Sequence, residues 1–364
     1  MNKISMRQAI MLVVGMIFSP AVRLFSSFVS GRGDQASWMA PIFSGIFMLI
    51  FMFVLWSLIK DNRNFYQHLE YSFGLKISKL VAVLYIIWGV LLTSVQIRYY
   101  SQRVASTIYT EIGMDIFIII LVGICVYSLR NGISVLARMN ELLLPVITVV
   151  AVFMLVLLTP DIKPKVLVPL NDWTSLVHVS VFNLASFGYL SFVLFFVDEI
   201  NQKETFKKHA AISTVALTLF SVWLFITVIG TLGPHIIQKL PYPFFAVVKQ
   251  ISLGEFLQHI EAFVITLWIL SDFVLISFIG AATVKLYAGI TQSKDAREFH
   301  LPYFALCASL VAIMGRTNHE LEILSEKLFI PLNLVFLFII PFIVFVIGKI
   351  KKKIIANRAG NVIY

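Results

Sequence analysis

Apolar runs of about twenty residues recur along the whole chain, and they leave it very few possible folds. Each run is long enough to cross the roughly 30 Å hydrocarbon core of a bilayer as a helix. Backbone polar groups find no water there, so only helices and closed barrels span a membrane. Of the 364 residues, 59% are hydrophobic and only 13% are charged, whereas a soluble domain carries about a quarter charged residues. The sequence therefore predicts an all-α polytopic membrane protein.

Ten such runs predict ten transmembrane helices. The predicted spans are Ile10–Phe28, Trp38–Ile59, Leu80–Ile97, Met114–Leu129, Leu142–Leu158, Leu176–Val197, Ile212–Leu232, Ala262–Leu286, Leu301–Met314 and Leu328–Ile347. Lys and Arg collect in cytoplasmic connections, and with the N-terminus inside, the inner segments hold nineteen of them against ten outside. We therefore expect two cytoplasmic termini, with residues 1–350 forming one transmembrane domain and residues 351–364 a basic cytoplasmic tail.

The first span is interrupted by residues that disfavour a helix. Gly15 lies near its middle, and Ser19-Pro20 follows four residues later. Proline removes a backbone donor, and its ring clashes with the carbonyl one turn earlier, so the helix should break or kink here. Unwound backbone in a bilayer must face buried protein or a water-filled cavity. The interruption therefore predicts either a binding site or a simple packing kink.

A second interruption occupies the corresponding place in the sixth span. Ten spans divide into repeats at about residues 10–158 and 176–347, and Ser186-Phe187-Gly188 lies near the middle of the first span of the second repeat. Paired interruptions of this kind point to a transporter-type binding site near the membrane midplane. The amino ends of half-helices attract a carboxylate, and the opposing carbonyls attract an ammonium or a cation. This pattern predicts a zwitterionic amino acid as the ligand.

Ten residues are candidates for the ligand site. Asp272 is the one carboxylate near the centre of a predicted span, where it would hold the ligand's ammonium or a cation, or form only a structural hydrogen bond. Tyr85 and Trp88 share one face of the third span, and such a stripe is typical of packing as well as of a pocket. The predicted substrate-binding residues are Gly15, Met16, Ile17, Ser19, Tyr85, Trp88, Asn183, Ser186, Gly188 and Asp272.

Other classes of function find no support in the sequence. It contains no zinc-protease, phosphate-loop or nucleophile-elbow pattern, so we expect neither an enzyme nor a bound cofactor or metal. Cys125 and Cys307 stand alone in separate apolar runs, which is typical of packing residues. The formal charge of +10 is spread over the connections and the tail, so we expect a lipid bilayer and no nucleic acid as partner.

Short motifs near the ends of the first two spans and in the last large outer connection carry a family resemblance. They are Ile4-Ser5 and Arg7-Gln8 before the Gly15 span, Asp34-Gln35 leading to Trp38, and then Pro243, Ile251, Phe256-Leu257, Glu261 and Trp268. In these residues the chain resembles the spore germination permease family, the B subunits of endospore nutrient germinant receptors. That family is similar to the amino acid–polyamine–cation transporter superfamily. The resemblance implies the ten-helix inverted repeat of the leucine transporter, with helices 1 and 6 broken.

The resemblance also implies a function. It implies a subunit that binds a nutrient such as an amino acid between helices 1 and 6, in the inner spore membrane or the bacterial cytoplasmic membrane. The implied partners are a larger membrane A-type subunit and a lipoprotein C-type subunit. The chain departs from the family pattern at Gln258-His259, where Glu-Arg is common, and at Gly188-Tyr189-Leu190-Ser191, where members often carry an acid.

The alternative function is an amino-acid permease coupled to protons or sodium ions. The missing acid at the sixth-span interruption disfavours proton coupling, whereas the intramembrane carboxylate of Asp272 favours it.

The excess of basic residues on one side predicts a topology that labelling can test. Single cysteines placed at Lys165 and Lys239 should react with an impermeant reagent added outside right-side-out vesicles, whereas cysteines at Lys207 and Lys294 should stay protected. The reverse pattern would show that the orientation is inverted.

Overall fold

The computed structural model describes residues 3–22, 33–107, 113–168, 173–240, 242–250, 261–293, 295–315 and 317–360. The α-helices in them are α1 (Met6–Val22), α3 (Ala40–Lys60), α4 (Phe65–Phe73), α5 (Leu75–Thr107), α6 (Met114–Arg130), α7 (Ile133–Leu158), α8 (Trp173–Phe187), α9 (Phe206–Leu232), α10 (Pro234–Ile237), α11 (Pro243–Val248), α12 (Glu261–Thr291), α13 (His300–Leu310), α14 (Asn318–Leu324), α15 (Ile330–Leu334) and α16 (Ile340–Gly360).

Tighter and wider helical turns and two short strands complete the chain. The 3₁₀ segments are η2 (Gln35–Met39), η3 (Thr159–Asp161), η4 (Pro164–Leu167), η5 (Gly188–Glu199), η6 (Lys203–Thr205), η8 (Ala296–Phe299) and η9 (Val311–Ile313). The π-helical segments are η10 (Ser325–Phe329) and η11 (Val335–Ile339). The strands β1 (Ile4–Ser5) and β2 (Ile200–Asn201) pair in parallel.

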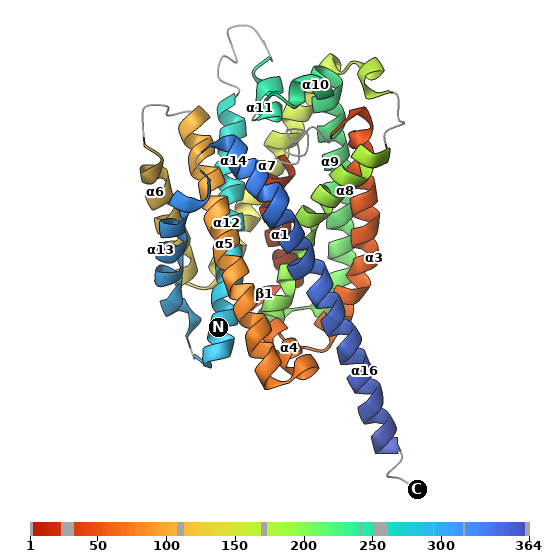
Figure 1. Ribbon diagram of the computed structural model, residues 1–364, viewed down its shortest axis with the longest axis vertical. Helices are drawn as coiled ribbons and strands as arrows, with labels where there is room; N and C mark the ends of the chain where they lie inside the picture. The colour runs from red at the N-terminus through yellow and green to blue at the C-terminus, as the bar shows by residue number, and fades with distance from the viewer. Residues whose placement is uncertain are drawn as a thin grey trace.

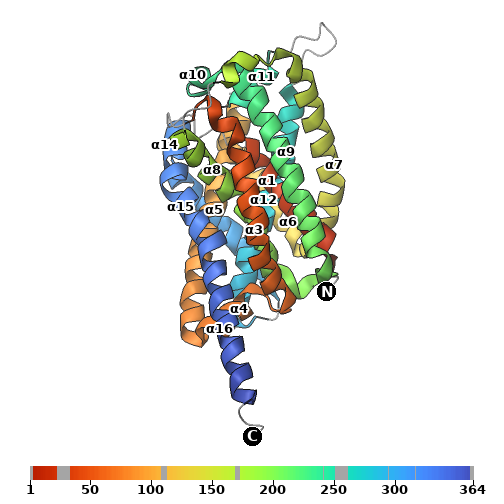
Figure 2. The ribbon, with the colours of Figure 1, turned by 90° about the vertical axis from the view of Figure 1, so that its right-hand side faces the viewer.

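The long helices form one bundle (Figure 1). Near its centre, α12 packs against α5, α1 and α7, while α3 packs against α8 and α9. The short helix α4 lies at one end of the bundle, and α10 and α11 lie at the other, so these two ends are called the α4 end and the α11 end. The segments α14, η10, α15, η11 and α16 follow one another without a break from Asn318 to Gly360, and we call them together the last helix. Its final part, α16, extends beyond the bundle at the α4 end (Figure 2).

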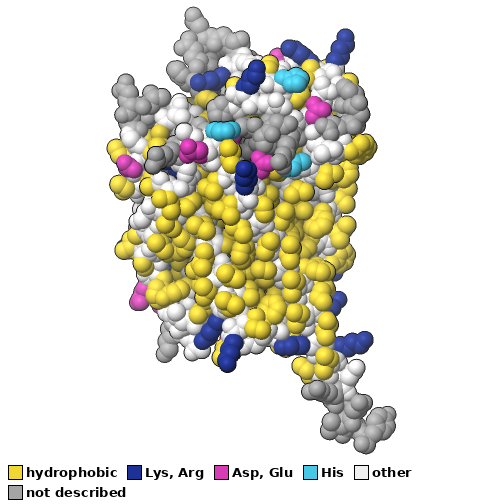
Figure 3. Space-filling model, in the orientation of Figure 1, with side chains coloured by type: hydrophobic (Ala, Val, Ile, Leu, Met, Phe, Trp, Pro, Cys, Tyr) yellow, Lys and Arg dark blue, Asp and Glu magenta, His cyan; other side chains and the backbone are white. Residues whose placement is uncertain are grey.

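An apolar belt surrounds the middle of the bundle. On the face shown in Figure 3, hydrophobic side chains cover the central band, and charged side chains gather at the two ends. Large apolar residues such as Ile50 and Phe53 of α3 are 64% and 68% exposed. Contiguous exposed apolar surface on this scale is unfavourable in water, so the belt is the surface that faces lipid.

Seven helical segments in the described residues are long and apolar enough to cross a membrane. They are Gln35–Lys60, Leu75–Thr107, Ile133–Asp161, Trp173–Glu199, Lys203–Leu232, Ala262–Thr291 and His319–Ile355. Each overlaps one of the predicted spans. The other three predicted spans overlap the shorter helices α1, α6 and α13. The prediction of an all-α multi-pass membrane protein is confirmed.

A capping box starts α1. Ser5 Oγ accepts a hydrogen bond from the Gln8 backbone N–H at 3.1 Å, and Gln8 Oε1 accepts one from the Ser5 N–H at 2.9 Å. These bonds satisfy two amide groups at a helix start that would otherwise be unpaired. Ile4 and Ser5 also pair with Ile200 and Asn201. The Ser5–Gln8 motif therefore anchors the start of α1 to the end of the sixth span.

The described part of α1 is a single helix that passes through Gly15. Between Met6 and Val22 the helix type does not change, so the interruption that the sequence predicted at Gly15 is absent from this range. Residues 23–32 and the side chain of Ser19 lie outside the described part. The other motif residues and the labelling site that lie outside it are Ile251, Phe256-Leu257, Gln258-His259 and Lys294.

In the sixth span the helix type changes at the predicted position. The α-helix α8 ends at Phe187, and the 3₁₀-helix η5 continues directly from Gly188 to Glu199. Runs of 3₁₀-helix longer than three or four residues are uncommon, and those inside a longer helix often mark a hinge. A Cβ at Gly188 would lie 2.5 Å from Cε2 of Phe338 in the π segment η11. Glycine at this position therefore allows η5 to pack closely against the last helix.

The helix α4 is held beneath α3 by a buried histidine. His68 Nε2 lies 2.9 Å from the carbonyl oxygen of Leu58, and burial lowers the pKa of His68, which favours the neutral imidazole. At the start of α4, Asn64 Oδ1 accepts a hydrogen bond from the Gln67 N–H at 3.0 Å. These contacts fix the position of Asn64 and of the residues that follow it at the α4 end.

Substitution of Gly188 tests the packing of η5 against η11. Gly188→Ala should lower the free energy of unfolding by about 1–3 kcal/mol, the usual cost of forcing an extra methyl group into a packed interior. Gly123→Ala on α6 is the control, because a Cβ at Gly123 meets no atom within 4 Å. Thermal unfolding of both variants in the same detergent measures the difference. Equal midpoints for the two variants would contradict the close packing at Gly188.

Candidate functional site

Asp272, the predicted partner of the ligand's ammonium, forms an ion pair within the protein. The Arg103 guanidinium of α5 contacts the Asp272 carboxylate of α12, and the two side chains are only 2% and 1% exposed. Arg103 Cζ also lies 4.6 Å from the ring centroid of Trp268, which adds a cation–π contact. The structure therefore places a protein cation where the sequence predicted a ligand group.

Gly15, the predicted centre of the first interruption, lies where α1 meets α7 and α12. Its carbonyl oxygen accepts a hydrogen bond of 2.7 Å from Ser271 Oγ. A Cβ at Gly15 would collide with the side-chain amide of Asn140, which is fully buried on α7. The neighbouring Met16 and Ile17 are buried as well. In the described residues these positions serve the packing of three helices.

A small polar cavity lies between α5, α8 and the last helix, and we call it the polar cavity. Its volume is about 70 Å³. Its lining residues are Leu92, Val95, Gln96, Tyr99, Phe182, Ala185, Ser186, Tyr189, Glu322, Ser325, Phe329, Ile330 and Asn333. Ser186 was predicted from the sequence, and it is the penultimate residue of α8, two residues before η5 begins.

Hydrogen bonds centred on Tyr189 hold the wall of the polar cavity. The Tyr189 hydroxyl oxygen accepts bonds from Gln96 Nε2 at 3.3 Å and Asn333 Nδ2 at 3.4 Å. Asn333 Oδ1 in turn accepts a bond of 3.2 Å from Trp88 Nε1. Three helices therefore share one network of neutral donors and acceptors, of which sequence analysis had identified only Trp88 as a site residue.

The π segment η11 supplies two carbonyl acceptors next to this network. Tyr85 donates its hydroxyl proton to the Phe336 carbonyl at 2.6 Å, and Ser191 donates to the Leu337 carbonyl at 2.7 Å. Backbone of this kind is common where a helix is adapted to a functional site. The predicted residue Tyr85 thus forms a hydrogen bond with the last helix.

Rings from α4, α5, η5 and η11 form a layer, which we call the aromatic barrier. It consists of Phe65, Tyr85, Trp88, Phe192, Phe195 and Phe336, whose neighbouring ring centroids are 4.7–6.0 Å apart. Such pairs each contribute about 0.5–1.5 kcal/mol beyond their buried area. Tyr189, which lines the polar cavity, packs against the barrier residue Phe192, and their ring centroids are 5.9 Å apart.

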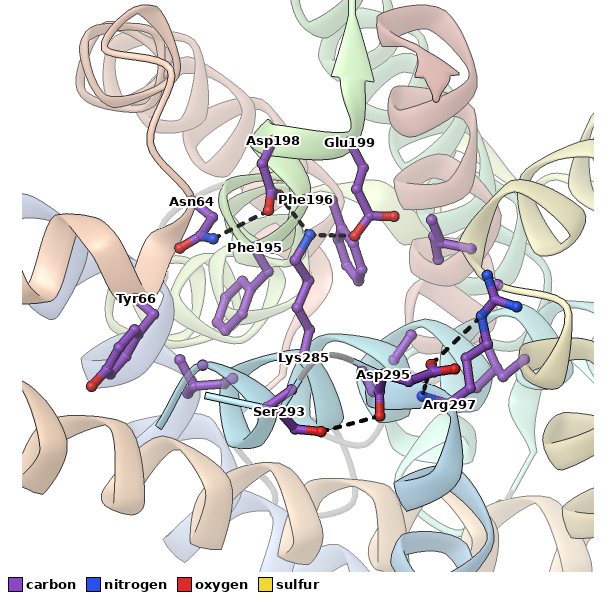
Figure 4. A pocket seen from close by; sticks show the side chains of 18 of the residues that line it. Asn64, Tyr66, Phe195, Phe196, Asp198, Glu199, Lys285, Ser293, Asp295 and Arg297 are labelled. Carbon is purple, nitrogen blue, oxygen red and sulfur yellow. Dashed lines mark hydrogen bonds and ion pairs between the residues drawn. The ribbon is translucent and has the colours of Figure 1, made fainter. Parts of the chain in front are cut away.

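A larger cavity lies on the α4 side of the aromatic barrier, and we call it the charged cavity (Figure 4). It has a volume of about 460 Å³, and the barrier residues Phe65 and Phe195 form part of its wall. Lys285 of α12 contacts Asp198 at 2.5 Å and also contacts Glu199. Asn64 Nδ2 donates to Asp198 at 3.2 Å. The end of η5 is thereby tied to both α12 and α4.

The remaining predicted residues do not line the polar cavity. Asn183 Nδ2 donates to the Val179 carbonyl of its own helix at 3.2 Å, and Gly188 contacts the last helix as described above. The structure brings Tyr85, Trp88 and Ser186 to the polar cavity or its wall, while Gly15 and Asp272 lie at the α1–α12 contact. Sequence analysis did not identify Tyr189, Asn333 and Glu322 as members of the site.

Solved structures with the same fold are secondary transporters. A nucleobase-cation-symport-1 family transporter, closed and with bromovinylhydantoin bound, gives a TM-score of 0.67 at 12% identity and covers 91% of this chain and 75% of its own. A substrate-bound, outward-open Na⁺-coupled sialic acid symporter gives 0.65 at 11% identity, covering 93% and 79%. The chain is therefore a multi-pass membrane protein with the transporter fold.

The family follows from matches along nearly the whole sequence. Residues 3–321 match the family model described as spore germination protein. Spore germination protein KB of Bacillus subtilis (strain 168) is 25% identical over 365 residues, covering 96% of each chain. Spore germination protein XB of Bacillus anthracis is 22% identical, covering 89% of this chain and 91% of that protein. The chain belongs to the spore germination permease family, which confirms the resemblance seen in its motifs.

The Arg103–Asp272 pair should be a stability determinant. Asp272→Asn leaves the Arg103 charge buried without its counter-charge, which should cost about 3–5 kcal/mol of unfolding free energy. The double variant Arg103→Met with Asp272→Leu should recover most of that loss, because it removes both charges. Asp295→Asn is the control, since the Asp295–Arg297 pair is 56% and 46% exposed and exposed pairs contribute little.

Thermal unfolding in detergent measures these three variants. A wild-type unfolding midpoint for Asp272→Asn would show that the ion pair is dispensable for stability, and it would return Asp272 to the candidates for ligand binding.

Proposed function

We propose that this protein is a nutrient-sensing subunit of a spore germinant receptor, and that its ligand is a small amino acid bound in the polar cavity. The observation that carries the proposal is the position of this cavity. It lies beside the α8–η5 change in helix type, and the aromatic barrier lies between it and the charged cavity. A ligand bound there could change the helix type at the start of η5. The aromatic barrier would prevent it from crossing to the charged cavity.

The segment η5 would carry the signal. Its first residues pack against the last helix, and its last residues, Asp198 and Glu199, bind Lys285 on α12. Because η5 is one continuous segment, a change of its helix type at the polar cavity would move the ion pairs at the α4 end. The ligand can drive such a change only by its difference in affinity for the two packings.

The wider architecture is proposed from the family and the fold. We take α1, α6 and α13 as spans together with the seven longer segments, which gives ten helices in two inverted repeats. Both termini would be cytoplasmic, with the α4 end inside. A larger membrane subunit and a lipoprotein subunit would read the ligand-induced change in the inner spore membrane.

A coupled amino-acid permease is the second candidate. Two observations favour it: the similar solved structures are transporters, and the charged cavity offers an exit of sufficient volume on the α4 side. In this reading the aromatic barrier would be a gate that opens during each cycle.

Tyr189→Phe distinguishes the two functions. Removal of the hydroxyl leaves the amides of Gln96 and Asn333 without their shared acceptor. At about 1–3 kcal/mol for such a loss, the half-maximal concentration of the active amino acid should rise roughly 5- to 150-fold. The measurement is germination of spores that depend on this protein, and Tyr127→Phe, at an exposed position on α6, is the matched control.

Uptake by reconstituted vesicles supplies the second measurement. We expect no uptake of that amino acid under a proton or sodium gradient. Gradient-driven uptake that is weakened by Tyr189→Phe would favour the permease, and a germination response unaffected by Tyr189→Phe would remove the polar cavity from the function.

A further inference from the structure

We infer that Glu322 determines the charge of the ligand, so that the polar cavity accepts a small molecule with a protonated amine and rejects an anion. This inference rests on the proposed role of the polar cavity, and it replaces Asp272 as the expected ammonium partner.

Glu322 is the one acidic side chain among the described residues that line the polar cavity. It lies on α14, within the segment His319–Ile355 that is apolar enough to span a membrane. Its side chain is half-buried and lines the polar cavity. Among the residues that the structure describes, no Lys, Arg or His pairs with it, whereas the next carboxylate, Glu326, lies 3.7 Å from His178 Nε2. A carboxylate withdrawn from water is unfavourable unless a counter-charge or a hydrogen-bond donor pairs with it.

None of the other described groups that line the cavity supplies a counter-charge for Glu322. The polar members, apart from Glu322, are Gln96, Tyr99, Ser186, Tyr189, Ser325 and Asn333, all neutral, and none of the described residues that line the cavity is basic. A cationic ligand would therefore be stabilised by Glu322. An anionic ligand would meet a like charge and no counter-charge, which is how a binding site excludes a competitor.

The cavity also restricts the size of the ligand and its orientation. At about 70 Å³ it has room for about six water-sized groups. Tyr99 donates a hydrogen bond of 3.2 Å to the carbonyl of Leu321, next to Glu322. Since α5 runs from the α4 end toward the α11 end and Tyr99 follows Gln96 along it, Glu322 lies nearer the α11 end than Gln96 does. Gln96 and Asn333 lie deeper, next to the aromatic barrier. The ammonium would therefore face the α11 end, and the opposite polar end of the ligand, a carboxylate in an amino acid, would face the amides.

A panel of paired compounds tests this inference on the full chain in lipid nanodiscs. For glycine, L-alanine, L-valine and L-asparagine, the amide derivative carries the amine without a carboxylate, and the N-acetyl derivative carries the carboxylate without the amine. Binding is measured as a shift of the unfolding temperature with concentration. At least one amide should stabilise the protein, and its N-acetyl counterpart should not do so at a 100-fold higher concentration.

Variants of Glu322 assign the effect to this residue. Glu322→Gln should weaken binding of the active amide roughly 10- to 150-fold, the range for losing a charged hydrogen bond, while Glu322→Asp should retain most of it. Glu320→Gln is the control, because Glu320 is exposed on the same helix. The unfolding temperature without ligand shows whether each variant is folded.

Three results would overturn the inference: no amide binds, an N-acetyl compound binds as well as its amide, or Glu322→Gln binds like the wild type. Failure of the receptor function would give a different result. Amine binding that depends on Glu322, together with an unchanged germination response in Glu322→Gln spores, would keep the inference and refute the nutrient-sensing role.

Discussion

The cost of an unsatisfied polar group inside a membrane governs this structure. With no water available, each buried donor, acceptor or charge needs a partner within the protein. The Arg103–Asp272 pair meets this requirement for two full charges at the contact between α5 and α12. Ser271 does so for a backbone carbonyl of α1, and Tyr189 does so for two amides. These partners come from different helices, so satisfying them also fixes how the helices pack.

Departures from regular α-helix occur where the polar groups gather. The 3₁₀ segment η5 and the π segment η11 face one another, with Gly188 allowing the close approach and Ser191 bonding to the Leu337 carbonyl. Two carbonyl oxygens of η11 accept hydrogen bonds from side chains of α5 and η5. The irregular backbone is buried in protein, as a membrane requires. We propose that η5 and η11 are the segments whose packing against each other could change between two arrangements.

Much of the fold could be predicted from hydropathy, and less of the site. Apolar runs located every long helix, and Gly188 correctly marked a change in the sixth span. Sequence analysis did not identify Arg103 and Glu322 as important, because a span predicted from hydropathy ends where charged residues begin. Arg103 lies beyond the predicted end of the third span at Ile97, and Glu322 lies before the predicted start of the tenth at Leu328. Only tertiary structure shows that the first charge has an internal partner and that the second lines a cavity.

A small sensor site has a limited free energy of binding. The very best small ligands reach about 1.5 kcal/mol per non-hydrogen atom, so a ligand of about six such atoms has a ceiling of about 9 kcal/mol. If the competent packing is populated about once in a hundred molecules, the apparent affinity falls about 100-fold, to tens of micromolar at best. With so little binding free energy available, most of it must come from contacts that favour the ligand-competent packing over the other one. A single charged contact, such as the one proposed for Glu322, is strong enough to decide that balance, because hydrogen bonds to ionised groups are roughly twice as strong as neutral ones.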